Sequence, residues 1–192
     1  WEYYHNHLLE IPYIWQGGMA IQGGIIFACI AAYFYLKKHQ IPVLPFADTV
    51  TPGIILGQAI GRIANFMNGD AFGHPTGQDF GLLYPDTTLA YHTYGAQPLW
   101  PAEVWECQGD LLIFVLLLWY GCKTRAEGTT FCLYIMFYSL LRFFLENYRG
   151  DYGTLALGLK SAQITSLAAF VGAFILFLYF HFKYKSKSGI SE

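Results

Sequence analysis

Residues 161–182 carry no charged side chain and are long enough, as a helix, to cross the hydrocarbon core of a bilayer. The rest of the chain agrees with this: 55% of its residues are hydrophobic and 12% are charged. That charged share is about half that of a typical soluble domain. We therefore expect an integral membrane protein. A net charge of −2 and the lack of a long basic stretch argue against a nucleic-acid-binding module.

Five segments have the length and composition of membrane-spanning helices, which predicts an all-α polytopic membrane protein. A segment rich in Gly, Pro, Asp and Thr separates the second span from the third and predicts an outer loop of about 30 residues. The predicted spans lie near 18–36, 46–68, 101–122, 128–148 and 161–182, and the outer loop covers 69–100. We expect them to form one transmembrane domain over residues 1–192.

Basic residues predict the orientation of these spans, because Lys and Arg are enriched in cytoplasmic loops. Seven of the eleven Lys and Arg residues follow the first, third and fifth spans: Lys37, Lys38, Lys123, Arg125, Lys183, Lys185 and Lys187. These sites alternate consistently along the chain. The C-terminus is therefore predicted to be cytoplasmic and the 69–100 loop to be external.

Four basic residues fall on the opposite, outer side: Arg62, Arg142, Arg149 and Lys160. A charge at the centre of a membrane helix costs about 2.5–3.5 kcal/mol, and less near the interface. Residues of this kind are kept mainly where something pairs with them, so they are candidates for function. The alternative is that they are interfacial side chains or structural ion pairs.

Polar residues also gather at the outer ends of the predicted helices. The segment GRIANFMNGDAFG places Arg62, Asn65, Asn68 and Asp70 where the second span ends. An arginine is a planar, multi-donor group suited to binding phosphate.

The fourth span supplies a second basic set. Arg142, Glu146 and Arg149 share one helix face at i, i+4 and i+7, and Arg142 and Glu146 are spaced to pair. The third span enters from the same side with an acidic set: Glu103, Glu106 and Asp110. Facing acidic and basic stripes would build a polar cavity open to the outer leaflet. A membrane transporter with such a cavity is one alternative, although no inverted repeat is evident.

No metal site is predicted. His5 and His7 form an HxH pair, but no third ligand lies near them in the sequence.

The segment GRIANFMNGDAFG resembles the signature G-R-x-[GA]-N-F-x-N-x-E-x-x-G of the bacterial prolipoprotein diacylglyceryl transferase family. The matching positions are Gly61, Arg62, Ala64, Asn65, Phe66, Asn68 and Gly73. Asp70 stands where the family has glutamate. Four further segments are similar to family segments in order and spacing: IWQGGMAIQGG (14–24), LWPAEVWE (99–106), RFFLENYRGD (142–151) and GLKSAQITS (158–166).

The sequence departs from the family at several positions. Gln22 occupies a position where many members have a histidine that is a proposed base, and Glu103 replaces a glutamine. Trp100 and Trp105 replace histidine and tyrosine. The first two of the family's seven spans are not in this chain, so we expect the native start to lie upstream of Trp1. An inactive relative that binds lipid or precursor is therefore a second alternative.

The resemblance implies an enzyme of the bacterial inner membrane that transfers diacylglyceryl from phosphatidylglycerol to the lipobox cysteine in the signal peptide of a prolipoprotein. Its active site faces the outer leaflet, and it needs no metal or organic cofactor. The expected catalytic residues are Arg142, Glu146 and Asp70. The expected phosphatidylglycerol-binding residues are Arg62, Asn65, Asn68, Gly73, Arg149 and Gln22.

Overall fold

The structure, a computed structural model, describes residues 21–123, 126–150 and 159–188. Within these ranges it consists of helices and connecting turns, without a named strand. Its elements are α1 (Ile21–Lys38), α2 (Val43–Asn68), α3 (Leu89–Tyr94), α4 (Ala102–Gly121), α5 (Thr129–Leu145), the short 3-10 helix η3 (Glu146–Tyr148) and α6 (Ser161–Ser188). The chain divides into two units, Trp1–Val43 and Leu44–Glu192, and each is described by itself.

All five predicted spans are helical, so the predicted all-α membrane class is confirmed. Three helices are long and apolar enough to cross a membrane: Val43–Asn68, Thr129–Tyr148 and Ser161–Ser186. The count of five spans, like the single transmembrane domain, stays a prediction, because α1 and α4 are not among these three helices. Some predictions rest on positions outside the described residues, namely 18–20, Arg125, His5 and His7.

In the first unit, α1 is an apolar helix with its charge at one end. Lys37 and Lys38 form its last turn, and most of its large side chains are exposed. Gln40 follows with a positive φ of 55°, and Ile41 N–H closes the turn on the carbonyl of Leu36 at 2.9 Å. An apolar exposed surface of this kind is suited to lipid rather than to water.

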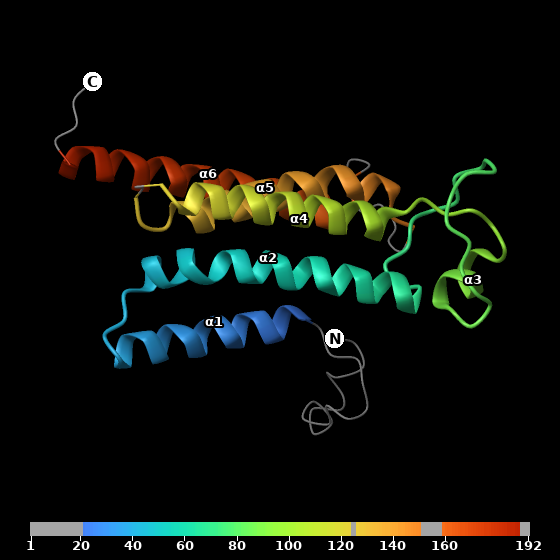
Figure 1. The fold of residues 1–192 in the computed structure, drawn as a ribbon, viewed down its shortest axis with the longest axis horizontal. Coiled ribbons are helices and arrows are strands. Elements are labelled where there is room, and N and C mark those ends of the chain that lie inside the picture. Colours follow the sequence, from blue (N-terminus) through green and yellow to red (C-terminus); the bar gives the residue numbers. More distant parts are fainter. Residues whose placement is uncertain (1–20, 124–125, 151–158, 189–192) are drawn as a thin grey trace. The chain divides into compact units, whose positions relative to one another are not determined.

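In the second unit, α2, α4 and α5 share a hydrophobic core. Ile55 of α2 packs with Ile113 and Leu117 of α4, and aromatic and leucine side chains of α5 cover them. Gly109 lets Leu141 of α5 lie directly on α4, because a Cβ at position 109 would meet the Leu141 side chain. On its other side α5 packs against α6, and α4, α5 and α6 run side by side in Figure 1. This packing fixes the rotation of each helix and so the residues that face one another.

Asp48 ties α2 to the start of α5. Its carboxylate accepts hydrogen bonds from the backbone N–H groups of Gly128 at 2.8 Å and Phe131 at 2.9 Å. The first N–H groups of a helix have no partner within the helix, and a carboxylate there also interacts favourably with the helix dipole. The capping residue of α5 is Gly128, which has no side chain, so α2 supplies the missing acceptor.

The loop between α2 and α4 folds on a small core of its own. Phe72, Ala90 and Leu99 are buried together, with Tyr84 and Tyr94 packed against them. Within the described residues, β-pairing is limited to isolated bridges, two of which involve Leu99. Hydrogen bonds from this loop reach the end of α2 and the residues after η3. The loop therefore closes over one end of the helices of this unit.

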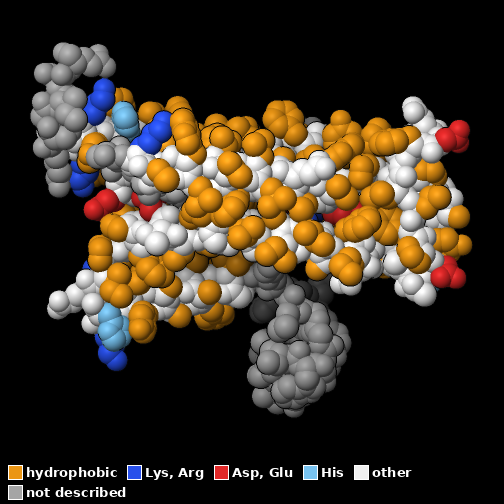
Figure 2. All heavy atoms as spheres, viewed as in Figure 1, with side chains coloured by type: hydrophobic (Ala, Val, Ile, Leu, Met, Phe, Trp, Pro, Cys, Tyr) orange, Lys and Arg blue, Asp and Glu red, His pale blue; other side chains and the backbone are white. Residues whose placement is uncertain are grey.

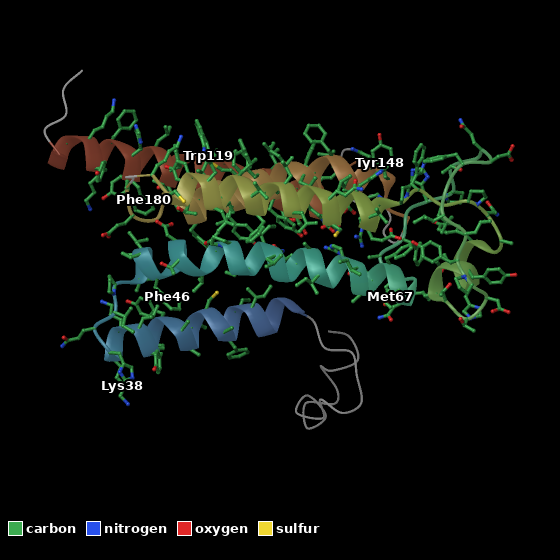
Figure 3. All side chains as sticks on the ribbon, viewed as in Figure 1. Lys38, Phe46, Met67, Trp119, Tyr148 and Phe180 are labelled. Atoms are coloured by element: carbon green, nitrogen blue, oxygen red, sulfur yellow. The ribbon has the colours of Figure 1, made fainter. Side chains whose placement is uncertain are left out.

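Hydrophobic side chains cover much of the helix surface shown in Figure 2, as expected of helices that face lipid. Figure 3 identifies the end near α3, where Met67 and Tyr148 lie, whereas Trp119 and Phe180 lie toward the other end. The predicted site residues of α2, α4 and α5 all belong to the end near α3.

Candidate functional site

Glu106, near the start of α4, is the common partner of three arginines. Its Oε1 atom lies 2.7 Å from Nη2 of Arg62 in α2. Its Oε2 atom lies 3.3 Å from Nη1 of Arg142 in α5 and 3.5 Å from Nη1 of Arg149, which follows η3. The Glu106 side chain is 1% exposed. One buried carboxylate therefore brings together arginines from three parts of the fold.

Glu146 supplies a second carboxylate. Its Oε2 atom lies 2.9 Å from Nη2 of Arg142, one helical turn earlier. The pairing predicted from their i, i+4 spacing is thus confirmed. The predicted place of Arg149 on the same helix face is wrong, because α5 ends at Leu145 and Arg149 is extended after η3. Arg142 uses one terminal nitrogen for Glu106 and the other for Glu146, an arrangement that a lysine with a single nitrogen cannot reproduce. We call Arg62, Glu106, Arg142, Glu146 and Arg149 the arginine–carboxylate cluster.

The cluster contains three guanidinium groups and two carboxylates, so one positive charge is in excess. Its two carboxylates are almost fully buried, whereas the side chains of Arg62 and Arg142 are 20% and 15% exposed. The accessible part of the cluster is therefore cationic. Guanidinium groups that keep free donor positions can bind a phosphate through charge-assisted hydrogen bonds.

A groove leads to Arg142 between α5 and α6. It has a volume of about 340 Å³. Small and hydroxyl-bearing residues make up much of its wall, including Ser139, Ala162, Thr165, Ser166 and Ala169. The groove runs along two lipid-facing helices and leaves one side of Arg142 accessible.

Tyr138 is a member of this site that the sequence reasoning did not select. Its hydroxyl donates a hydrogen bond to Oε1 of Glu106 at 3.3 Å. The available signal was its position four residues before Arg142, on the same helix face. Glu106 is one of three acidic residues of the third span, whose spacing does not distinguish it from the other two. The available signal was its place as the last residue of the family-like segment 99–106.

Those other two acidic residues, Glu103 and Asp110, receive no hydrogen bond among the described residues, although both are fully buried. We expected facing basic residues to neutralise the acidic residues of the third span. Of the three, Glu106 is the one that pairs with arginines.

Asn65, Asn68 and Asp70 follow Arg62 toward the end of α2. The Arg62 Nη1 atom donates to Oδ1 of Asn65 at 3.4 Å, and Asn68 is exposed. The Asp70 backbone N–H donates to the carbonyl of Asn65 at 2.9 Å. Among the described residues, Arg62 pairs with Glu106 rather than with Asp70.

Gly73 lies against the backbone of Arg149. The two residues form an antiparallel bridge, and Gly150 N–H donates to the carbonyl of Phe72 at 3.2 Å. A Cβ on Gly73 would collide with the carbonyl oxygen of Trp100 and lie 2.7 Å from the Trp100 Cβ. The absence of a side chain here therefore lets the loop reach the segment that carries Arg149.

Three aromatic rings lie beside the cluster. The centroids of Trp100, Trp105 and Tyr148 are 5.2–5.6 Å apart in each pair. Trp105 adjoins Glu106 in sequence, and Tyr148 adjoins Arg149. Large amphipathic rings of this kind favour the membrane interface, where one side is apolar and the other is wet.

The Gln22 side chain lies outside the described residues, so its proposed contact with phosphatidylglycerol stays a prediction. In the described part of the chain, no group of three or more His, Cys, Asp or Glu side chains is placed to hold a metal ion.

Comparison with known proteins identifies relatives of this chain. The family model described as prolipoprotein diacylglyceryl transferase matches residues 1–179. A phosphatidylglycerol–prolipoprotein diacylglyceryl transferase from Geobacillus kaustophilus is 37% identical over 180 residues, which cover 93% of this chain and 67% of that protein. The enzyme from Staphylococcus saprophyticus is 36% identical over 186 residues, covering 96% and 66%. The enzyme from Clostridioides difficile is 37% identical over 193 residues, covering 100% and 72%. The chain thus spans about two thirds of the length of these curated relatives.

Proposed function

Because the chain belongs to the prolipoprotein diacylglyceryl transferase family, we propose that it transfers the diacylglyceryl group of phosphatidylglycerol to the lipobox cysteine of a prolipoprotein. The family match confirms the resemblance and the transferase class that the sequence predicted. The observation that carries the proposal for this chain is the arginine–carboxylate cluster, whose exposed part is cationic and lies at one end of membrane helices.

The charge change of the reaction fits such a cluster. The cysteine thiolate attacks the diacylglycerol carbon that bears the phosphate, so an S–C bond forms and the C–O bond to phosphate breaks. The electron pair leaves with glycerol-1-phosphate, whose phosphate gains a second negative charge. Fixed guanidinium groups stabilise that developing charge without having to reorganise. The thiol proton goes to a base, since the thiolate is the nucleophile.

The roles of individual residues follow from their contacts. Arg62 and Arg142, the two most exposed arginines of the cluster, bind the phosphate. Glu106 and Glu146 hold these guanidinium groups in place, and Arg149 adds positive charge beside Oε2 of Glu106.

The predicted residues outside the cluster take supporting roles. Asn65 and Asn68 orient the glycerol or phosphate oxygens, and Gln22 contributes to the same lipid. Asp70 accepts the thiol proton. Gly73 contributes through the backbone of Arg149, to which it is bridged.

The membrane orientation of the site belongs to the same proposal. The site faces the outer leaflet of the bacterial inner membrane, and the C-terminus is cytoplasmic. Support comes from the basic residues after the first, third and fifth predicted spans, which the positive-inside rule assigns to the cytoplasm. Phosphatidylglycerol and the exported signal peptide would then meet at one bilayer surface.

The proposal is tested by following transfer directly. The protein is expressed from its complete reading frame and reconstituted in phosphatidylglycerol vesicles with a lipobox peptide that contains one cysteine. The expected product is the peptide with the mass of one diacylglyceryl adduct, absent when that cysteine is serine. A peptide of unchanged mass, in a preparation that still binds phosphatidylglycerol, would contradict the proposal and favour an inactive lipid-binding relative.

A further inference from the structure

Lys160 is the fourth basic residue on the outer side, and its ammonium group is bound to backbone carbonyls. Its Nζ atom donates to the carbonyl of Glu146 at 2.8 Å and to the carbonyl of Arg149 at 2.6 Å. Lys160 immediately precedes α6, whereas its two acceptors follow α5. The contact therefore joins the start of one helix to the end of another, at the residues that carry two members of the arginine–carboxylate cluster.

The two carbonyls lie at the start of η3 and just after its end. The last carbonyl groups of a helix have no N–H partner within it, and a cation near them interacts favourably with the helix dipole. The carbonyl of Glu146 also receives the N–H of Arg149, at 3.4 Å. Lys160 thus strengthens the turn by which the chain passes from the Glu146 side chain to the Arg149 side chain.

Gln163, one turn into α6, makes a second attachment to the same segment. Its Nε2 atom donates to Oδ1 of Asn147 at 3.1 Å, and its Oε1 atom accepts the N–H of Lys160 at 3.0 Å. Gln163 is 4% exposed. Gln163 therefore fixes the backbone of Lys160, and the Lys160 side chain binds the turn between Glu146 and Arg149.

Arg149 is consequently held from two sides. Lys160 binds its carbonyl, and Gly73 pairs with its backbone from the loop. Its guanidinium then lies 3.5 Å from Glu106. Because the backbone of Arg149 ends this turn, a shift of the turn would displace the contact between Arg149 and Glu106.

We propose that Lys160 is a positioning residue of the transfer reaction: it closes the turn between Glu146 and Arg149 and so holds Arg149 against Glu106. Two of its three N–H donors are used on those carbonyls. The inference rests on the proposed function, and direct binding of the lipid phosphate by Lys160 is the competing role that the test must separate.

The test compares transfer kinetics of wild-type protein, Lys160→Met, Lys160→Arg, Arg149→Ala and the Lys160→Met/Arg149→Ala double variant. Lys183→Met, an exposed lysine near the end of α6, is the matched control. Lys160→Met is expected to lower kcat roughly 10- to 100-fold, because misplacing a charged group by about 1 Å costs up to that much. KM for phosphatidylglycerol should stay unchanged, and Lys160→Arg, which keeps the cation and its donors, should retain most activity.

The loss of activity in the double variant, compared with the losses in the two single variants, distinguishes the two roles of Lys160. If Lys160 acts through Arg149, Lys160→Met should cause little further loss in the Arg149→Ala background. Independent, multiplying losses would overturn the proposal. So would a Lys160→Met variant that raises KM at constant kcat, which is the result expected of a lysine that binds the phosphate itself.

Hydrogen exchange tests the positioning role of Lys160 without measuring transfer, so failure of this proposal can be distinguished from failure of the proposed function. Amide hydrogen exchange at Arg149 and Gly150 should be faster in Lys160→Met than in wild type and Lys183→Met. Equal exchange would contradict the positioning role whether or not the protein transfers lipid. Faster exchange in a protein without transfer activity would support the positioning role while the proposed function fails.

Discussion

The Nη2 atom of Arg62 in α2 lies 2.7 Å from the Oε1 atom of Glu106 in α4, an ion pair between residues 44 positions apart. This pair connects the signature segment at the end of α2 with the last residue of the family-like segment 99–106 in α4. Because Glu106 also receives Arg142 and Arg149, one carboxylate sets the position of three cations. The consequences for activity and stability can be separated by mutation.

Replacing Glu106 with glutamine should impair both stability and transfer. Leaving buried cations without their carboxylate costs about 3 kcal/mol or more, and misaligned guanidinium groups lose transition-state stabilisation. We expect a lower melting temperature in detergent and a decrease of at least about 100-fold in kcat. Glu127→Gln, which removes an exposed carboxylate outside the cluster, is the control and should match wild type. Normal transfer by Glu106→Gln would contradict the central role of this residue.

Arg142→Ala should abolish detectable transfer while the protein still inserts into the membrane. Losing one preorganised donor to a developing oxyanion costs about 100- to 1000-fold in kcat. Arg142→Lys should recover only part of this, since one ammonium group cannot replace the two nitrogens that contact Glu106 and Glu146. The measurements are peptide mass after transfer and membrane fractionation of each variant. An active Arg142→Ala protein would exclude Arg142 from phosphate binding.

Gly73→Ala should disrupt the site without removing a polar group. The new methyl group would collide with the carbonyl of Trp100 and push the loop away from Arg149. We expect a loss of transfer of about 10-fold or more. The control is Gly57→Ala in α2, where no atom of α4, α5 or α6 lies within 4 Å of the added Cβ. Equal activity of the two alanine variants would show that the Gly73 bridge is dispensable.

Asp48→Ala should lower stability and leave the chemistry intact. It removes two hydrogen bonds to the start of α5, at the end of the helix away from Arg142. Hydrogen bonds to a charged group contribute about 1.5–3 kcal/mol, so the melting temperature should fall. Transfer per folded molecule, measured below that temperature, should equal that of wild type. A selective loss of kcat with unchanged melting temperature would refute this structural role.

Local features of the sequence predicted most of the fold. The Arg142–Glu146 ion pair follows from i, i+4 spacing and is present at 2.9 Å, because helix geometry alone brings such residues together. The 69–100 segment was predicted as a loop from its Gly and Pro content. The bridge between Gly73 and Arg149 was not predicted, since it depends on how that loop closes on a distant turn.

The sequence by itself determined the helices, the membrane class and the family, because hydropathy over about 20 residues and short motifs are local properties. Only the tertiary structure decided which acidic residue of α4 receives the arginines. That choice depends on the rotation of α4 against α2 and α5, which is set by the packing of Ile55 with Ile113 and of Leu141 over Gly109. Tertiary structure also decided that Lys160 turns to the carbonyls of Glu146 and Arg149. The three acidic residues of α4 are all buried, and they differ because, within the described residues, only Glu106 meets arginine side chains of neighbouring elements.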